Sequence, residues 1–331
     1  MPSAKILVTG ATGFIASALI PALRAAEYAV RAASRRPGDL SGVEWVTLPS
    51  SGMLCDWRGT ADGIDTIVHL AGLAHFHWKA EGIGVIGRIK KSDIALALET
   101  ANITNARLLA SEARRVGVRR MIFVSSIGAV ASHSPAAISE LTVPFPDTDY
   151  GRSKLMAELV LREELDQSDI ELVIIRPPLV YGPRNVANMF RLIRWVESGI
   201  PIPLRSIHNK RSLVSIDNLV SLILNCIHAP GAVGLPLLIS DGEDLSTPEL
   251  IRRIAKVTQS PCRLIPFPKS LLLSMDFLFG MDVFRKLCGN LFVDSSRTFE
   301  RVGWKPLIGV DEGLRRTVAR EHPAMQTKGL S

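Results

Sequence analysis

The sequence predicts an α/β protein in which a doubly wound parallel sheet is followed by a smaller C-terminal lobe. Apolar runs of strand length, rich in Val and Ile, alternate with helix-length segments through the first half of the chain. A glycine-containing turn follows the first run and opens the first helical segment. After Arg176, prolines interrupt the pattern, which indicates a lobe of shorter and less regular elements.

The expected strands are short apolar segments bounded by polar or glycine residues. They are Lys5–Thr9, Ala29–Ala33, Glu44–Leu48, Asp65–Leu70, Arg120–Ser125 and Glu171–Arg176. Three helices are expected between them, at Ala16–Ala26, Ala101–Val116 and Gly151–Leu165. Strands that alternate with helices in this way form βαβ units, so neighbouring strands should run parallel.

The change of pattern near residue 177 divides the chain. We expect residues 1–177 to form a dinucleotide-binding domain, with residues 212–240 returning to it. Residues 178–211 and 241–331 would then form the smaller lobe. In a doubly wound sheet, ligands bind at the carboxyl ends of the strands, so the candidate site residues are sought there.

Composition excludes several classes of protein. With 47% hydrophobic and 21% charged residues among 331, the chain is globular and not disordered. The net charge of +7 is not accompanied by an array of basic and aromatic residues, so anionic small molecules are expected as partners and nucleic acid is not.

The cysteines and the apolar segments bear on location. Four scattered cysteines without a CxxC pair suit a reducing compartment, so a cytoplasmic protein without a zinc site is expected. No signal peptide or membrane-spanning segment is expected. The run Ser270–Phe284 is interrupted by two aspartates and predicts a buried or lid-like amphipathic helix, with membrane-surface contact as the alternative.

The turn at Thr9–Ala16 predicts dinucleotide binding. Gly10 permits a tight turn, and Gly13 allows a diphosphate to approach the amides at the start of the helix. Ala16 occupies the third small position, where the helix packs on the strand. The alternative is a plain glycine turn, but its position between the first strand and the first helix favours the nucleotide.

The residues after the second strand bear on the choice of cofactor. Arg35 and Arg36 stand where an acidic residue would bind the ribose hydroxyls of NAD. A guanidinium there can bind a 2′-phosphate, which favours NADP over NAD, although both arginines would also suit a solvated loop. Asp56 is expected to accept a hydrogen bond from the adenine amino group.

Tyr150 and Lys154 predict acid–base chemistry. They stand four residues apart and so share a face of the expected helix. A phenol has a pKa of about 10 in water, and an adjacent ammonium together with a positive nicotinamide would lower it. Tyr150 could then exchange a proton with an alcohol or ketone during hydride transfer. Ser126, rather than Ser125, is expected to position the substrate oxygen, because alternation sends the two side chains to opposite sides.

Taken together, these motifs resemble the extended short-chain dehydrogenase/reductase family of NAD(P)-dependent nucleotide-sugar epimerases, dehydratases and reductases. The matching stretches are TGATGFIA at 9–16, HLAG at 69–72, VSS at 124–126, YGRSK at 150–154, RPPLVYGP at 176–183 and the GW of Val302-Gly-Trp304. The resemblance implies a Rossmann fold and a set of cofactor contacts. Besides Gly10, Gly13, Arg35, Arg36, Asp56, Tyr150 and Lys154, this set comprises Thr12, Phe14, Ile15, Leu70, Ala71, Gly72 and Asn102.

The resemblance also implies a substrate. Asn188 and Arg211 match residues that bind the diphosphate of a nucleotide sugar, in addition to Ser126 at the sugar. The chain is similar to a subgroup that includes UDP-glucose 4-epimerase-like proteins and UDP-4-keto-6-deoxy-N-acetylglucosamine reductases of bacterial surface polysaccharide (lipopolysaccharide and O-antigen) synthesis. The segment Ala74–Asp93 does not match the family.

Three functions are compatible with these residues. The first is a 4-keto-sugar reductase that uses NADPH and a UDP sugar. The second is a UDP-glucose or UDP-N-acetylglucosamine 4-epimerase with retained NAD, which would share every catalytic residue. The third is a non-catalytic NADP-sensing regulator, which would not need Ser126, Tyr150 and Lys154 together. The resemblance further implies a homodimer through Ala101–Val116 and Gly151–Leu165.

Overall fold

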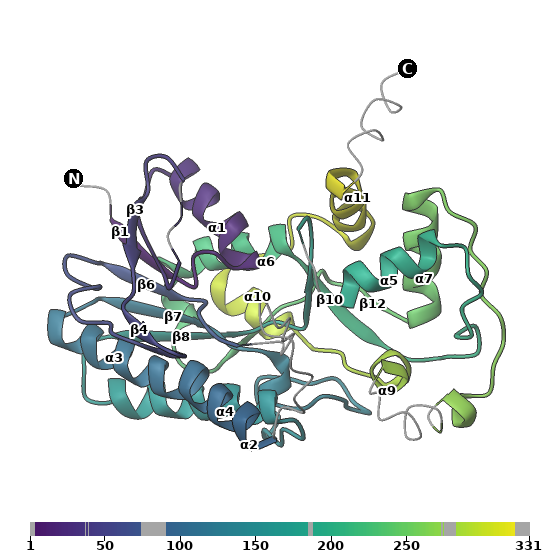
Figure 1. Ribbon diagram of the computed structural model, residues 1–331, viewed down its shortest axis with the longest axis horizontal. Coiled ribbons are helices and arrows are strands. Elements are labelled where there is room, and N and C mark those ends of the chain that lie inside the picture. Colours follow the sequence, from purple (N-terminus) through teal and green to yellow (C-terminus); the bar gives the residue numbers. More distant parts are fainter. Residues whose placement is uncertain are drawn as a thin grey trace, which may run out of the picture. The chain divides into compact units, whose positions relative to one another are not determined.

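The computed structural model describes residues 4–36, 38, 40–73, 91–184, 188–272, 274 and 283–321. The chain divides into two compact units (Figure 1). The first comprises Met1–Ala131, Val143–Arg176 and Cys226–Leu237, and the second comprises Ser132–Thr142, Pro177–Asn225 and Leu238–Ser331.

Strands of the first unit form a seven-stranded sheet in the order β11-β8-β7-β6-β1-β2-β3, whose edge strand β11 lies at the boundary of the two units. Its strands are β1 (Lys5–Thr9), β2 (Ala29–Ser34), β3 (Glu44–Thr47), β6 (Thr66–His69), β7 (Arg120–Val124), β8 (Glu171–Arg176) and β11 (Leu237–Leu238). The pairs from β8 across to β3 are parallel, and the chain reverses its direction of travel through the sheet after β3. This confirms the predicted doubly wound parallel sheet.

Helices cover both faces of this sheet. Figure 1 shows α1 (Phe14–Ala25) on one face, with α3 (Asn105–Val116) and α4 (Asp149–Leu165) side by side on the other. Leu109 of α3 and Leu161 of α4 are fully buried in one cluster with Ile67 and Met121 of the sheet. Burial of such side chains on both faces explains why the strands read as continuous apolar runs. The shorter elements of this unit are β4 (Ser50–Ser51), β5 (Leu54–Cys55), η2 (Ile127–Ala129) and η3 (Pro230–Ala232).

One expected helix begins differently from the prediction. The helical run starts with α2 (Lys91–Leu98), passes through the π-helical segment η1 (Glu99–Thr104) and only then continues as α3. The prediction of a regular helix from Ala101 was therefore wrong for its first turn. A π-helical turn inserts an extra residue per turn, which apolar periodicity does not reveal, and such turns often occur at functional sites.

The second unit has its own core. A three-stranded sheet contains β9 (Leu179–Tyr181), β10 (Arg211–Ser215) and β12 (Asp244–Leu245). The helices assigned wholly or mostly to this unit are α5 (Asn188–Glu197), α6 (Ile216–Cys226), α7 (Thr247–Thr258), α9 (Val283–Cys288), α10 (Ser296–Val302) and α11 (Val310–Glu321). Much of the predicted helix at Ser270–Phe284 falls outside the described residues.

The segment that returns to the first unit is shorter than expected. It runs from Cys226 to Leu237, whereas residues 212–240 were predicted. The reason is strand pairing: Leu213 and Ser215 of β10 pair with Leu179 and Tyr181 of β9, so this strand belongs to the small sheet. Among the described residues, no helix is long and apolar enough to cross a membrane.

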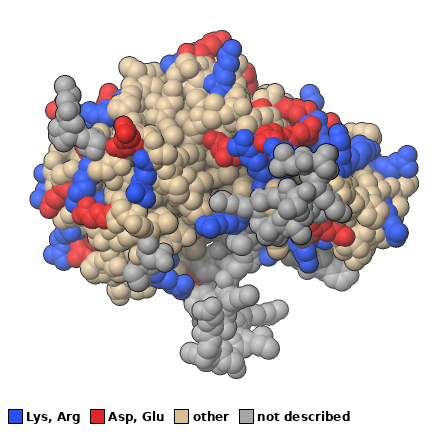
Figure 2. All heavy atoms as spheres, turned by 90° about the horizontal axis from the view of Figure 1, so that it is seen from above, with Lys and Arg blue, Asp and Glu red and all other residues tan. Residues whose placement is uncertain are grey.

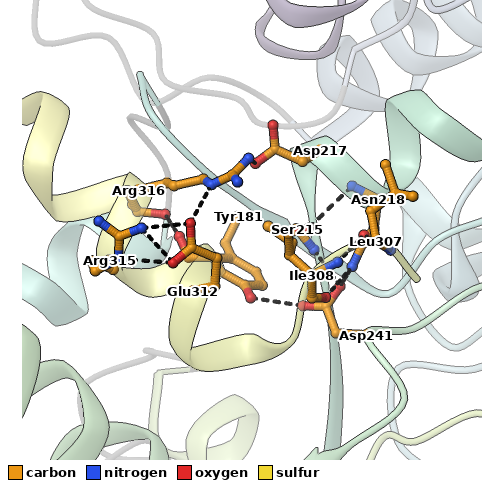
Figure 3. Close-up of polar contacts among 12 residues, drawn as sticks. Tyr181, Ser215, Asp217, Asn218, Asp241, Leu307, Ile308, Glu312, Arg315 and Arg316 are labelled. Atoms are coloured by element: carbon orange, nitrogen blue, oxygen red, sulfur yellow. Dashed lines mark hydrogen bonds and ion pairs between the residues drawn. The ribbon is translucent and has the colours of Figure 1, made fainter.

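A buried polar cluster ties the small sheet to its helices (Figure 3). The Tyr181 hydroxyl donates to Asp241 Oδ2 at 2.7 Å, and Asp241 Oδ1 accepts from the Ser215 amide at 2.8 Å and from Asn218 Nδ2 at 2.7 Å. Burial raises the pKa of Asp241. Gly313 of α11 leaves room for the Tyr181 hydroxyl, because a Cβ there would overlap it. These groups are satisfied by one another and form a structural centre of the second unit.

Candidate active site

The glycine turn connects β1 to α1 where β1 and β6 end side by side. Gly10 has φ +65°, and a Cβ at this position would lie 2.8 Å from the Ala71 amide nitrogen and 3.1 Å from the Leu70 carbonyl carbon. Both the dihedral angle and the space therefore require glycine. The turn holds Leu70, Ala71 and Gly72 next to the start of α1, so this part of the predicted cofactor set is brought together.

The start of α1 is suited to an anion. Gly13 is its N-cap residue, makes no side-chain cap and is followed by no acidic residue in the first turn. Thr12, Phe14 and Ile15 lie at the same turn. The first amides of a helix carry a partial positive charge and have no hydrogen-bond acceptor within the helix. A glycine turn without a side-chain cap fits the diphosphate of a dinucleotide, which would supply those acceptors.

The end of β2 carries the residues predicted to select the cofactor. Arg35 directs one guanidinium nitrogen to Met53 Sδ at 3.1 Å, and Arg36 is exposed. Asp56 is bound by Arg58 through contacts of 2.9 and 2.5 Å, which lower the pKa of Asp56 to about 2. The carboxylate predicted to bind adenine is thus ionised and already held by an arginine.

Tyr150 and Lys154 both lie on α4. The helix begins after Thr148, whose hydroxyl accepts from the Gly151 amide at 3.0 Å. The Tyr150 phenol forms a hydrogen bond with Ser126, whose hydroxyl also accepts from the Gly128 amide at 3.0 Å. Lys154 Nζ donates to the Val124 carbonyl at 3.0 Å. The three predicted catalytic side chains therefore converge at the carboxyl end of β7.

The choice between the two serines agrees with this geometry. Ser125 turns away from Tyr150 and donates to the buried Glu158 at 2.6 Å. Glu158 is in turn held by Arg176 through bonds of 2.9 and 2.6 Å. Ser126 is the serine that contacts the phenol. Strand alternation therefore separates a hydroxyl that meets the buried Glu158 from one that meets Tyr150.

The environment shifts both titrating groups. Burial raises the pKa of Tyr150, and the Ser126 hydroxyl opposes this shift. Burial lowers the pKa of Lys154 to about 8, and the charge of Glu158 opposes this shift. In the protein alone, desolvation thus outweighs the expected lowering of the Tyr150 pKa by the ammonium. A protonated Tyr150 is suited to donate a proton to a carbonyl oxygen.

This shift gives a pH prediction. Lys154 is protonated below a pH of about 8 and neutral above it, because burial lowers its pKa. If its ammonium is needed, kcat/KM for reduction should fall as pH rises through about 8, since this ratio reports the free enzyme. Steady-state rates across this range, in buffers of constant ionic strength, measure the profile. A flat profile through pH 8 would contradict the role given to Lys154.

Asn102 connects the end of β6 to α4. Its Oδ1 accepts from the Leu73 amide at 2.6 Å, and its Nδ2 donates to Ser153 Oγ at 2.8 Å. A Cβ at Gly72 would lie 3.0 Å from Asn102 Oδ1 and 3.5 Å from Lys154 Nζ. The π-helical turn therefore brings Asn102, Gly72 and Lys154 together, next to the predicted nicotinamide position.

Sequence reasoning missed His69. Its ring is fully buried, and Nδ1 forms a hydrogen bond of 2.7 Å with the Thr9 hydroxyl. The ring also stacks on Phe123, with 5.5 Å between the ring centroids. Lys154 Nζ lies 4.6 Å from the same Phe123 ring. Burial lowers the pKa of His69 to about 3, so it remains neutral. The sequence signal for this buried histidine was its position at the start of the HLAG stretch, 69–72.

Two further glycines also support the site. A Cβ on Gly151 would overlap the Gly128 carbonyl oxygen, and a Cβ on Gly128 would lie 3.2 Å from Ser126 Oγ. The turn η2 can therefore lie directly against the first turn of α4, which sets Ser126 beside Tyr150. Glycine is unfavourable inside a helix, so its presence immediately after Tyr150 was the sequence signal for a close backbone contact at this position.

Replacing Gly151 with alanine should damage both fold and site. The new methyl would displace backbone, so we expect a loss of about 1–3 kcal/mol in the free energy of unfolding. Displacement of Tyr150 by about 1 Å should lower kcat by about a hundredfold. Urea unfolding and steady-state rates measure these effects. Gly309→Ala is the control, because no atom lies within 4 Å of its added Cβ; equal effects in both variants would contradict the close packing.

The predicted substrate residues lie in the second unit. Arg211 begins β10, and its guanidinium donates to the carbonyls of Lys286 at 2.6 Å and Gly289 at 3.2 Å. These contacts orient the group and leave further N–H donors for an anion. Asn188 is the first residue of α5, and its side chain lies outside the described part.

A doubly wound sheet, a glycine turn at an uncapped helix start and a Tyr150–Lys154 pair beside a strand-end serine define a dinucleotide-dependent oxidoreductase of the short-chain dehydrogenase/reductase type. The model of the NAD dependent epimerase/dehydratase family matches residues 6–235. The chain belongs to this family. It is an enzyme that depends on a nicotinamide dinucleotide, as the motifs predicted.

Named relatives agree with this assignment. The chain is 36% identical over 318 residues to a UDP-glucose 4-epimerase of Vibrio cholerae, covering 95% of this chain and 94% of that protein. It is 26% identical over 211 residues to a dTDP-4-dehydro-6-deoxyglucose reductase of Escherichia coli, covering 61% of each. Among solved structures, MoeE5 in complex with UDP-glucuronic acid and NAD matches with a TM-score of 0.76 and 22% identity, over 97% of this chain and 99% of that chain.

Proposed function

We propose that this protein transfers a hydride at C4 of a UDP sugar, as a 4-keto-sugar reductase of surface polysaccharide synthesis. The observation that carries this proposal is the convergence of Ser126, Tyr150 and Lys154 beside the glycine turn. A relative named as a dehydro-sugar reductase and another named as a UDP-glucose 4-epimerase support chemistry at this carbon.

Each side chain has a definite part in the reduction. Ser126 donates a hydrogen bond that orients the C4 carbonyl oxygen toward Tyr150. Tyr150 gives its phenolic proton to that oxygen as the carbon is reduced. Lys154 would hold the ribose of a bound cofactor, and its ammonium would stabilise the phenolate that remains. The bound cofactor would supply the hydride.

The nucleotide is expected to bind in the second unit. A guanidinium suits a diphosphate because it offers paired donors, and Arg211 is already oriented by two backbone carbonyls. Asn188 is proposed as a second contact. MoeE5 was solved in complex with UDP-glucuronic acid and NAD, which supports a UDP sugar as the substrate class.

NADPH is the proposed reductant. Arg35 and Arg36 occupy the end of β2, where a 2′-phosphate would lie. A comparison of kcat/KM for NADPH and NADH measures this preference, and Arg35→Ala with Arg36→Ala should reduce it. A preference for NADH in the unaltered protein would overturn the assignment of NADP and leave the fold and family unchanged.

A 4-epimerase with retained NAD is the second candidate. The observation that favours it is the 36% identity to the Vibrio cholerae protein over nearly the whole chain. An epimerase uses the same side chains but returns the hydride to the opposite face of the sugar, so it consumes no cofactor.

One measurement separates the two functions. Purified protein, NADPH and UDP-4-keto-6-deoxy-N-acetylglucosamine are mixed, and nicotinamide absorbance is followed. Stoichiometric loss of NADPH is the result expected of a reductase. Absence of loss, together with interconversion of UDP-glucose and UDP-galactose without added cofactor, would instead establish the epimerase.

The protein is further proposed to be a cytoplasmic homodimer. Its four cysteines are all unpaired, as in a reducing compartment. Three apolar side chains on these helices are exposed: Leu108 of α3 by 39%, and Met156 and Leu159 of α4 by 46% and 47%. Such an apolar helical surface suits a contact between two copies of the chain. Light scattering should give twice the mass of the chain, and Leu159→Lys should halve it.

A further inference from the structure

Two segments of the second unit carry basic residues and no acidic ones. Residues 198–216 and 250–275 contain no Asp or Glu. Their Lys and Arg residues are Arg205, Lys210, Arg211, Arg252, Arg253, Lys256, Arg263 and Lys269. Figure 2 shows Lys and Arg side chains, with some Asp and Glu among them, at the right-hand end, where Figure 1 labels α5 and α7. Segments of a single charge sign repel one another unless an anion lies nearby.

The two segments are joined by backbone hydrogen bonds. The Ile202 amide donates to the Arg263 carbonyl at 2.8 Å, and the Ile265 amide donates to the Ile202 carbonyl at 3.0 Å. The Arg205 amide donates to the Ile265 carbonyl at 3.1 Å. Basic residues that are sixty positions apart in the sequence are therefore held on one local structure.

The outer side of this structure combines charge with exposed apolar groups. Ile202 and Leu204 are buried in the core of the unit, and Leu264 packs against that core. Ile200 and Ile265 instead expose 59% and 42% of their surface. Exposed apolar side chains that gather in one place and are bordered by polar groups can mark an interaction site.

The charges on this side are not neutralised within the part of the second unit that the structure describes. Arg205, Arg263 and Lys269 are exposed and form no ion pair there. Arg253 of α7 differs, because it forms ion pairs with Glu243, Glu249 and Asp311. Leu271, which is 51% exposed, lies two residues after Lys269.

We propose that this side of the second unit, the basic-apolar surface formed by Ile200, Arg205, Arg263, Ile265, Lys269 and Leu271, binds peripherally to an anionic lipid bilayer. The cations would meet lipid phosphates while the aliphatic side chains enter the boundary between headgroups and acyl chains. The inference goes beyond the proposed reaction, because it concerns where the enzyme works.

A bilayer explains both features of the surface. A nucleic acid would account for the cations but would favour aromatic side chains for stacking on bases, and the surface contains none. An acidic protein would also accept the cations. Lipid is the partner whose binding requires the isoleucines as well as the charges, so the two contributions can be tested separately.

The test is sedimentation of the full chain with vesicles at about 0.1 M salt. One set contains phosphatidylcholine and phosphatidylglycerol in a ratio of roughly two to one, and the other contains phosphatidylcholine alone. We expect binding to the anionic vesicles and little binding to the neutral ones. The measurement does not use turnover, so its outcome is independent of the proposed function.

Three variants distinguish the contributions. Arg263→Glu with Lys269→Glu should weaken binding by at least about twentyfold. Ile200→Ser with Ile265→Ser should weaken it by about tenfold for each isoleucine. The control is Arg24→Glu with Lys305→Glu, which makes the same change in net charge at two exposed positions outside the surface and should bind as the unaltered protein does. Circular dichroism verifies that each variant is folded.

Several outcomes would overturn the inference. They are absence of binding to anionic vesicles, equal binding to neutral vesicles, and an equal loss in the control variant. If the isoleucine variant binds vesicles normally and a single-stranded RNA oligonucleotide binds as tightly as the vesicles do, the surface is a general site for polyanions and the bilayer assignment is wrong.

Discussion

Tyr150→Phe should lower kcat by about two to four orders of magnitude, because the phenol is the group placed to exchange a proton with the substrate oxygen. The change removes one oxygen atom and leaves the ring. Tyr150 contacts Ser126 through that hydroxyl and lies one helical turn before Lys154. The affinity for the cofactor, measured by fluorescence, should change far less than turnover, because the substitution does not alter the glycine turn.

Tyr28→Phe is the matched control for this experiment. Its hydroxyl also forms a side-chain hydrogen bond, at 2.7 Å to His228, but on the surface and away from the strand ends that carry the site. Its kcat should remain within about twofold of the unaltered protein. Unchanged turnover in Tyr150→Phe would refute the mechanism. A protein that binds NADPH but has no turnover even with Tyr150 intact would instead support the cofactor-sensing alternative.

Glu158→Gln should reduce the free energy of unfolding by about 3–5 kcal/mol, because it leaves a buried guanidinium without its counter-charge. Glu158 is fully buried and accepts two hydrogen bonds from Arg176 and one from Ser125. Arg176 is itself only 3% exposed, so water cannot hydrate its guanidinium once the carboxylate is lost. Urea denaturation, followed by circular dichroism, measures the change.

Glu163→Gln on the same helix is the control. Glu163 is 72% exposed at its side chain and meets Arg107 at 3.4 Å, so its removal should cost less than about 1 kcal/mol. Replacing both members of the buried pair, as Glu158→Leu with Arg176→Met, should restore much of the stability. Equal stability of the Glu158→Gln and Glu163→Gln variants would show that the buried pair contributes nothing.

The same substitution has a second consequence at the site. The charge of Glu158 raises the pKa of Lys154 against the effect of burial. Its removal should therefore move the alkaline limb of kcat/KM to lower pH, in proportion to the lost interaction. A stability change without any movement of this limb would indicate that Glu158 supports the fold alone.

Much of the fold and the site could be predicted because the relevant signals are local. Strands buried on both faces must be apolar throughout, so Lys5–Thr9 and Glu171–Arg176 were located at their observed bounds. Gly10 needs a positive φ, and Tyr150 and Lys154 need only the period of a helix to share a face. Each of these requirements is met within a few residues of chain.

Other features were missed because they depend on residues distant in the sequence. The return of Cys226–Leu237 to the first unit, in place of residues 212–240, is decided by the pairing of β10 with β9. The π-helical turn at Asn102 is accompanied by contacts to Leu73 and Ser153, which no periodicity encodes.

By itself, the sequence determined the class of fold, the glycine turn and the Tyr150–Lys154 pair, because backbone dihedral angles and helical spacing act over short stretches. Only the tertiary structure decided how Gly128 packs against Gly151 and how Glu158 pairs with Arg176. Close packing and the desolvation of charge arise only when segments far apart in the chain are brought into contact.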